Sequence, residues 1–197
     1  VTRMLAWSSS GHAGFILVAV VASSAQGAAA ALFYLLAYTF MVVGSFGVVT
    51  VLGRGGDGLH SLADYKGLAA KHPGTALLFT VFLLAQAGVP FTGGFLAKFY
   101  VINAAVDQGQ YVLAVIAMVS AVIGAFLYLR IIVAMYFDGN EYGGAEAELE
   151  GPAVRMPAGA AIALGLAVLG TLWLGILPDA ATDVAGDAVA QLVAFGN

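Results

Sequence analysis

The strongest constraint on the fold is that residues 4–53 contain no aspartate, glutamate, lysine or arginine. A run of this length is too long for one membrane-spanning helix, which needs about 20 residues. The polar stretch over 23–27 is the natural break, so the run predicts two spans, over 5–24 and 30–52. The chain has 61% hydrophobic residues, 9% charged residues and a mean hydropathy of +0.97, which is typical of an integral membrane protein.

A third hydrophobic region extends from Pro73 to about Val106. As one straight helix it would measure about 50 Å, whereas the hydrocarbon core is about 30 Å thick. Gly88, Pro90, Gly93 and Gly94 interrupt this region within the sequence GVPFTGG. They predict two half-helices, over 73–88 and 95–107, joined by unwound backbone. The alternative is a proline kink that only adjusts helix packing.

Two further spans are predicted over 111–137 and 157–177, which gives an all-α membrane bundle of five crossings, one of them discontinuous. The membrane domain is expected to cover residues 1–178. The remaining residues, 179–197, form an acidic tail with aspartates at a spacing of four (Asp179, Asp183 and Asp187). That spacing puts the carboxylates on one helical face, so the tail is either a short interfacial helix or a solvated segment.

Outside the predicted spans, lysine and arginine occur only in alternate connections. Arg3 precedes the first span, Arg54, Lys66 and Lys71 lie between the second and third spans, and Arg155 lies between the fourth and fifth. The other connections and the tail have neither residue type. The positive-inside rule therefore predicts that the amino end is cytoplasmic and that the carboxyl end lies on the opposite side of the membrane.

Lys98 follows the predicted helix break and lies nine residues before Asp107, which corresponds to a depth of about 13 Å. A lysine at this depth is costly, and burial disfavours its charged form. It is therefore a candidate proton relay. The alternative is a permanent ion pair with a carboxylate from a neighbouring chain, because no Asp or Glu of this chain lies at a similar depth.

Two more titratable residues are candidates for a proton path. His12 follows three serines and a glycine, and we expect it in the cytoplasmic third of the membrane, either as the entrance to a half-channel or as a hydrogen bond between helices. Arg130 lies about 10 Å from the end of its span, where snorkelling to the interface explains it at least as well as a pathway. Four tyrosines lie within spans and are expected to pack or to bind water: Tyr34, Tyr38, Tyr100 and Tyr128.

Several site classes find no support in the sequence. The chain has no cysteine, and its three histidines lack metal-binding spacing, so no metal or cofactor site is predicted. The glycine-rich segment 54–58 lacks the ending of a phosphate-binding loop and is read as a turn. No nucleic-acid or hydrolase signature is present. Because the sequence starts at Val1 and is hydrophobic almost at once, we expect a fragment of a longer protein.

Two segments carry a family resemblance: residues 3–14, RMLAWSSSGHAG, and residues 88–100, GVPFTGGFLAKFY. Both resemble the antiporter-like subunits of respiratory complex I, the proton-pumping NADH:quinone oxidoreductase, and within that family they are most similar to subunit N. The segments 44–47 and 128–130 fit the same pattern, and the resemblance extends from Arg3 to about Pro178. In subunit M the position of Lys98 usually carries glutamate. Subunit L usually has aspartate after this lysine and a long lateral helix, and neither is seen here.

The resemblance implies an inverted-repeat fold of fourteen helices, of which this chain would hold the last five. Lys98 matches the family's lysine in the discontinuous helix, which is thought to exchange protons with the non-cytoplasmic side, and His12 matches a histidine often found in the family. NADH, flavin, iron–sulfur clusters and quinone would be bound in or at other subunits. The implied partners are neighbouring membrane subunits, the lipid bilayer, protons and water, in the inner (plasma) membrane of the cell.

Two alternatives remain beside a proton-translocating subunit of this oxidoreductase. The chain could belong to a related cation/proton antiporter or membrane-bound hydrogenase, which share the fold and the lysine. It could also be a membrane scaffold that transports nothing.

Overall fold

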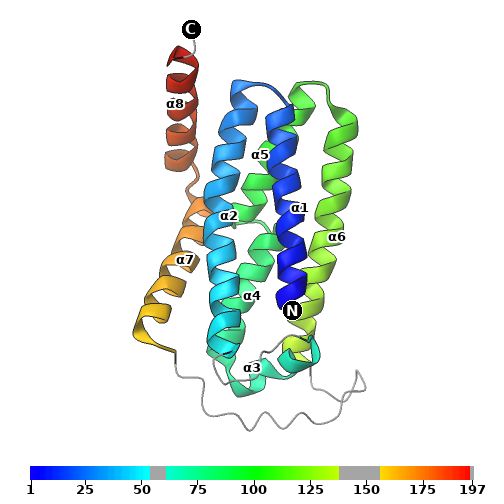
Figure 1. Ribbon diagram of the computed structural model, residues 1–197, viewed down its shortest axis with the longest axis vertical. Coiled ribbons are helices and arrows are strands. Elements are labelled where there is room, and N and C mark those ends of the chain that lie inside the picture. The colour runs from blue at the N-terminus through cyan, green and yellow to red at the C-terminus, as the bar shows by residue number, and fades with distance from the viewer. Residues whose placement is uncertain (54–60, 138–155, 196–197) are drawn as a thin grey trace.

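The computed structural model describes residues 1–53, 61–137 and 156–195. Four long helices in these ranges are apolar and long enough to cross a membrane: α1 (Thr2–Val21), α2 (Ala25–Leu52), α6 (Tyr111–Tyr136) and α7 (Ala158–Ile176). They run side by side in a bundle, with the amino terminus and α3 (Leu68–Lys71) at one end (Figure 1). The described residues form helices and no strands, so the predicted all-α membrane class is confirmed.

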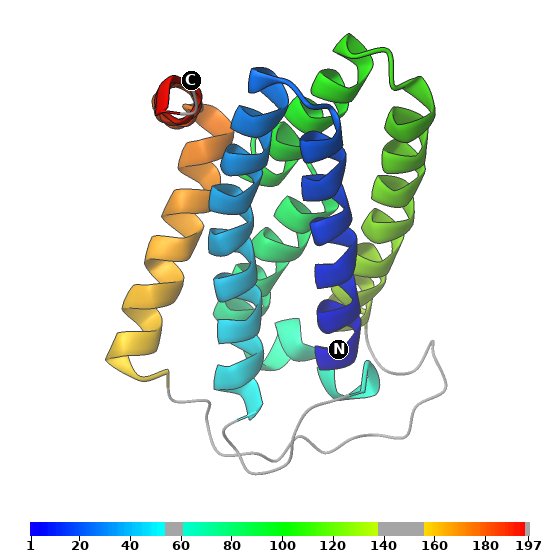
Figure 2. The same ribbon diagram turned by 45° about the horizontal axis from the view of Figure 1, so that its top comes forward.

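The third crossing along the chain is discontinuous. α4 (Pro73–Ala87) and α5 (Gly93–Asp107) have 15 residues each, so either alone is about 22 Å long and too short to span the membrane. They follow one another along the bundle, joined by non-helical residues at its centre (Figures 1 and 2). Gly88 ends α4 with a φ of 91°, in the left-handed region that glycine tolerates best.

The observed helices differ from the predicted spans mainly in the residue at which they begin. α2 begins at Ala25 rather than near residue 30, because the side chain of Ser24 accepts a hydrogen bond from the Gly27 backbone N–H and caps the helix. The loop before α4 is partly helical. It contains the short 3-10 helix η2 (Ala63–Tyr65) and α3, and the chain turns by 120° from this segment into α4.

Some predictions concern residues that the structure does not describe. These are the loop positions Arg54 and Arg155 and the glycine-rich segment 54–58. They lie outside the described residues.

α2 is the central helix, and it packs against α1, α4, α5, α7 and α8. Small residues permit these close approaches, as is common in membrane bundles. A Cβ atom at Gly44 of α2 would lie 2.2 Å from the ring of Phe82 on α4. A Cβ atom at Gly94 of α5 would lie 1.9 Å from the Ala85 carbonyl oxygen of α4. These two contacts fix the end of α4 between α2 and α5.

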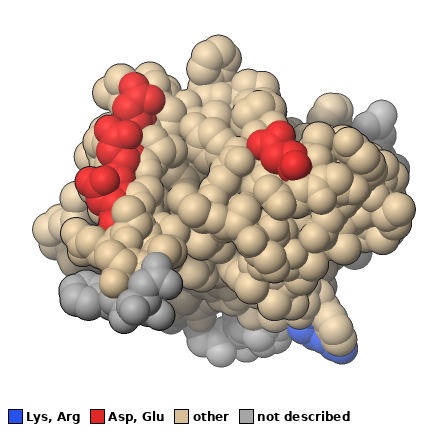
Figure 3. All heavy atoms as spheres, turned by 90° about the horizontal axis from the view of Figure 1, so that it is seen from above, with Lys and Arg blue, Asp and Glu red and all other residues tan. Residues whose placement is uncertain are grey.

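The last helix, α8 (Asp179–Phe195), has a different direction from the bundle. Figure 2 shows it end-on while α1, α2, α6 and α7 are seen from the side. Its buried residues Ala181, Ala185 and Val189 recur every four positions. The three aspartates of the tail are exposed and form a stripe along the helix (Figure 3). α8 is therefore amphipathic.

Candidate functional site at the broken helix

Lys98 lies in the second turn of α5 and only 8% of its surface is exposed. Its Nζ donates hydrogen bonds to the carbonyl oxygens of Gln86, at 2.6 Å, and Ala87, at 3.0 Å. Both carbonyls belong to the last turn of α4, where the aligned peptide dipoles leave partial negative charge. Within the described residues, the ammonium group is thus held by main-chain oxygens and not by a carboxylate.

The helix break is what leaves these carbonyls available. The Gly88 backbone N–H donates to the carbonyls of Leu84 and Ala85, and the Val89 N–H also donates to Leu84. The two carbonyls that follow, of Gln86 and Ala87, receive no intrahelical bond because α4 ends. A Cβ atom at residue 88 would lie 3.3 Å from Lys98 Nζ, so the glycine also makes room for the lysine side chain.

The four residues predicted to break the helix do different things. Gly88 caps α4, as described above. Gly93 and Gly94 begin α5 where it crosses α7 and α4, and a Cβ atom at Gly93 would lie 3.0 Å from Cβ of Leu174. Pro90 is exposed within the connecting turn.

His12 is the second titratable group near the break, and it is 4% exposed. Its Nδ1 lies 2.8 Å from the Tyr34 hydroxyl and its Nε2 lies 2.9 Å from the Tyr128 hydroxyl. Tyr128 is also hydrogen-bonded to the hydroxyl of Ser8. The imidazole stacks on Tyr38, with ring centroids 4.7 Å apart. His12 therefore belongs to a chain of hydrogen-bonding groups that joins α1, α2 and α6.

The sequence did not assign these partners. Tyr34 and Tyr128 were expected to pack or to bind water, and their hydroxyls instead bind the two nitrogens of His12. The available signal was that each is a tyrosine deep within a span, where its hydroxyl requires a partner. In addition, α1 begins at Thr2, so His12 lies near the middle of this helix.

A cavity of about 190 Å³ brings Lys98 and His12 together. Its volume is sufficient for several water molecules. The walls come from α1, α4, α5 and α6, and the polar lining consists of Ser8, His12, Gln86, Lys98, Ser120 and Tyr128. The ring of Phe15, also in the wall, has its centroid 5.7 Å from Lys98 Nζ, within the range of a cation–π contact. A proton could move between the lysine and the histidine through water in this space.

Arg130 is not part of this arrangement. It lies on the exposed side of α6 and does not line the cavity. Its position therefore favours the alternative of a side chain that reaches the membrane surface.

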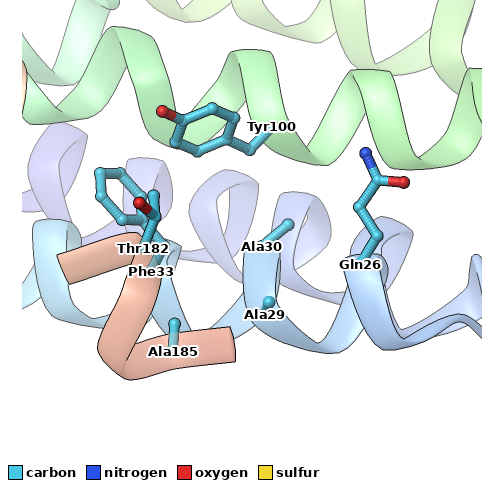
Figure 4. Close-up of a pocket in the computed structure, with 7 residues that line it drawn as sticks. All are labelled: Gln26, Ala29, Ala30, Phe33, Tyr100, Thr182 and Ala185. Atoms are coloured by element: carbon cyan, nitrogen blue, oxygen red, sulfur yellow. The ribbon is translucent and has the colours of Figure 1, made fainter. Parts of the chain in front are cut away.

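A second cavity, of about 170 Å³, lies between α2, α5 and α8. Figure 4 shows its lining, which is mostly alanine and aromatic carbon with the polar ends of Gln26, Tyr100 and Thr182 at its edges. It contains neither Lys98 nor His12. Among the described residues, no group of three or more histidine, aspartate or glutamate side chains could hold a metal ion.

Comparisons with known proteins agree with this architecture. The family model described as "NADH:quinone oxidoreductase/Mrp antiporter, TM" matches residues 1–124. The protein named NADH-quinone oxidoreductase subunit N 1 of Solibacter usitatus is 44% identical over 192 residues, which are 98% of this chain and 38% of that protein. NADH-quinone oxidoreductase subunit N of Halorhodospira halophila is 42% identical over 180 residues, 90% of this chain and 36% of the relative. The chain thus spans well under half the length of these relatives.

Two solved structures contain chains with a similar fold. A chain of respiratory complex I from Thermus thermophilus with bound aureothin superposes with a TM-score of 0.74 at 30% identity, covering 93% of this chain and 39% of that one. A chain of the Mrp complex from Dietzia sp. DQ12-45-1b gives a TM-score of 0.73 at 26% identity, over 92% of this chain and 40% of that one.

Proposed function

Because the chain belongs to the NADH:quinone oxidoreductase/Mrp antiporter transmembrane family, we propose that it is part of a proton-translocating membrane subunit of NADH:quinone oxidoreductase. Relatives at 40–44% identity that carry the name subunit N support this assignment. The redox reaction would take place in other subunits, which bind NADH, flavin, iron–sulfur clusters and quinone. This chain would contribute to the coupled movement of protons.

The observation that carries the proposal is the position of Lys98. Its ammonium group is buried, is held by two main-chain carbonyls and faces a cavity that also contains His12. A carboxylate partner would stabilise the charged lysine permanently. Carbonyl oxygens are weaker acceptors, so Nζ can lose a proton to water in the cavity and regain one later. The neutral amine still donates a hydrogen bond to a carbonyl, so the site keeps its geometry in both protonation states.

His12 would exchange the proton with Lys98 through the hydroxyl of Tyr128, which lines the same cavity, and the cavity water. An imidazole binds a proton at one nitrogen and releases one from the other, which suits it to a relay. Tyr34 and Tyr128 occupy both nitrogens and hold the ring in place. The hydroxyl of Ser8, bonded to Tyr128, extends the chain by one further group along α1.

The remaining assignments follow from the charged ends of the bundle. Residues 1–178 would form the membrane domain, with the amino end on the cytoplasmic side of the inner (plasma) membrane. The amphipathic α8, over 179–195, would lie at the opposite membrane surface with its aspartates towards water. Neighbouring membrane subunits of the complex and lipid would surround the bundle.

Substitution of Lys98 by methionine in the assembled complex tests the proposal. We expect NADH-driven proton pumping to fall by on the order of tenfold or more, because methionine fills the space without a titratable group. Lys98→Arg should also impair pumping, since arginine does not release its proton at accessible pH. Pumping can be measured with a fluorescent pH-gradient dye in membrane vesicles. Lys71→Met, on the exposed surface of α3, is the matched control. Wild-type pumping by an assembled Lys98→Met complex would contradict the relay.

A cation/proton antiporter subunit is the second candidate, which the similarity to a chain of the Mrp complex favours. The same membranes distinguish the two functions. If sodium ions move in exchange for protons without NADH oxidation, the antiporter assignment is correct.

A further inference from the structure

Gln86 is an amide buried at the end of α4, with 3% of its surface exposed. Its Nε2 donates a hydrogen bond to the hydroxyl of Ser45 on α2 and lies 3.4 Å from the carbonyl oxygen of Met41. Ser45 is fully buried, and its hydroxyl donates to the same Met41 carbonyl, at 2.8 Å. A buried amide that lost these partners would be destabilising, so the bonds hold the last turn of α4 against α2.

The main chain of the same residue contacts the candidate relay. The carbonyl oxygen of Gln86 accepts the shorter of the two hydrogen bonds from Lys98 Nζ. One residue therefore connects α2, through its side chain, to the ammonium group, through its backbone. One turn earlier, Phe82 occupies the space that a side chain at Gly44 would take, so the separation of the two helices is set by packing as well. The position of the carbonyls depends on both contacts.

Few other titratable groups act on the ammonium. The titratable side chains that share its cavity are His12 from α1 and Tyr128 from α6. Within their described bounds, α2, α4 and α7 contain no charged residue. The electrostatic environment of Nζ is therefore dominated by the carbonyls that it contacts, and a small displacement of these oxygens changes how strongly the charged form is held.

We propose that Gln86 is a positioning residue for Lys98: its amide, bound to Ser45, fixes the two carbonyls that hold the ammonium group and thereby sets the pH range of proton exchange. The proposal rests on the proposed function of Lys98. It adds Ser45 of α2 to the site, a residue that lies outside the motif around the helix break.

The test uses the full subunit in its assembled complex and measures NADH-driven proton pumping as a function of pH. Gln86→Leu keeps most of the side-chain volume and removes the amide. We expect the pH dependence of pumping to move towards lower pH by about half a unit, a threefold change at fixed pH, because loosened carbonyls stabilise the charged lysine less. Ser45→Ala should move it in the same direction. In the double variant the pH dependence should move no further than in Gln86→Leu alone, because both substitutions break the same hydrogen bond.

The control is Thr80→Val, which removes a hydroxyl from α4 that donates to the Ala76 carbonyl and lies 3.3 Å from the Tyr136 hydroxyl of α6, and Thr80 does not line the cavity of Lys98. It should leave the pH dependence unchanged. An assembled Gln86→Leu complex with the wild-type pH dependence overturns the positioning role. If that variant does not assemble, Ser45→Ala decides the question in the same assay. Lys98→Met separates the two proposals: if it pumps normally, the relay itself is wrong, whereas loss of pumping there with no displacement in Gln86→Leu rejects only the positioning role.

Discussion

At the scale of single residues, the segment before α4 contains a tyrosine whose hydroxyl is enclosed by protein. Tyr65 is 0% exposed, and its hydroxyl has no hydrogen-bond partner among the described residues. Burial, with a smaller contribution from the charge of Asp64, raises the pKa of Tyr65 to about 12. The aromatic ring of Tyr65 packs the loop against Phe79 of α4, whereas its hydroxyl oxygen makes no hydrogen bond to the described residues.

This arrangement predicts a pH-dependent difference between the wild type and Tyr65→Phe. The folded state disfavours the ionised hydroxyl, so the wild type loses stability as pH rises from about 10 towards about 12. Phenylalanine cannot ionise, and the variant should lose less stability over that interval. Near neutral pH the free energy of unfolding should change by less than about 1 kcal/mol. Thermal unfolding in detergent at several pH values measures both effects. Tyr111→Phe, at a position that is 64% exposed, is the control.

Other residue-scale features show where sequence reasoning succeeds and fails. The deep position of Lys98 could be predicted by counting residues from Asp107, because helical rise is constant. Its acceptors could not, since main-chain carbonyls are present at every residue and only the structure selects two of them. The contact between Gln86 and Ser45 joins residues 41 positions apart on separate helices, and no local pattern encodes it.

At the scale of helices, the crossing of α4 and α5 is the tightest feature near the candidate site. Gly94 lies so close to α4 that a Cβ atom would lie 1.9 Å from the Ala85 carbonyl oxygen and 2.8 Å from Met41 Sδ. A backbone atom cannot move aside as a flexible side chain can. The start of α5 must therefore shift whenever this position carries a side chain.

We expect Gly94→Ala to destabilise the subunit by about 1–3 kcal/mol and to reduce the amount of assembled complex, because overpacking forces the backbone to move. Gly165→Ala on α7 is the matched control, since a Cβ atom there would meet nothing within 4 Å. Thermal stability of the purified complex compares the two. Equal stability of both variants would mean that the crossing is looser than described.

The helices themselves were largely predictable. Hydrophobic length predicted every crossing, and the combination of glycine and proline predicted the interruption of the third region. The short helices η2 and α3 were not predicted, because three or four residues leave no periodic signal. The start of α2 was predicted about five residues late, because Ser24 acts as a cap within what was read as a connecting segment.

At the scale of the whole molecule, the described lysines and arginines outside the spans lie at one end of the bundle. Arg3, Lys66 and Lys71 lie at the end that holds the amino terminus and α3, where Asp64 is also found. The opposite end, seen from above in Figure 3, displays acidic groups, including the stripe along α8. This division is the basis of the proposed orientation.

Labelling can test this orientation directly, because the chain contains no cysteine. Lys71→Cys and Asp183→Cys each introduce one thiol at an exposed position. A membrane-impermeant maleimide should label residue 71 only in inverted vesicles and residue 183 only in intact spheroplasts. Labelling of both from the same side would contradict the five-crossing topology, and the opposite pattern would reverse the orientation.

The main-chain acceptors of Lys98 have a consequence for mutational scanning. Peptide oxygens survive every replacement of the side chains that bear them, so an alanine scan cannot delete the groups that bind the ammonium. Such a scan would report the effect of the Gln86 amide, but it would leave the carbonyls of residues 86 and 87 in place. Backbone chemistry, such as an ester in place of the amide bond between Ala87 and Gly88, weakens the carbonyl as an acceptor and reaches what conventional mutagenesis leaves intact.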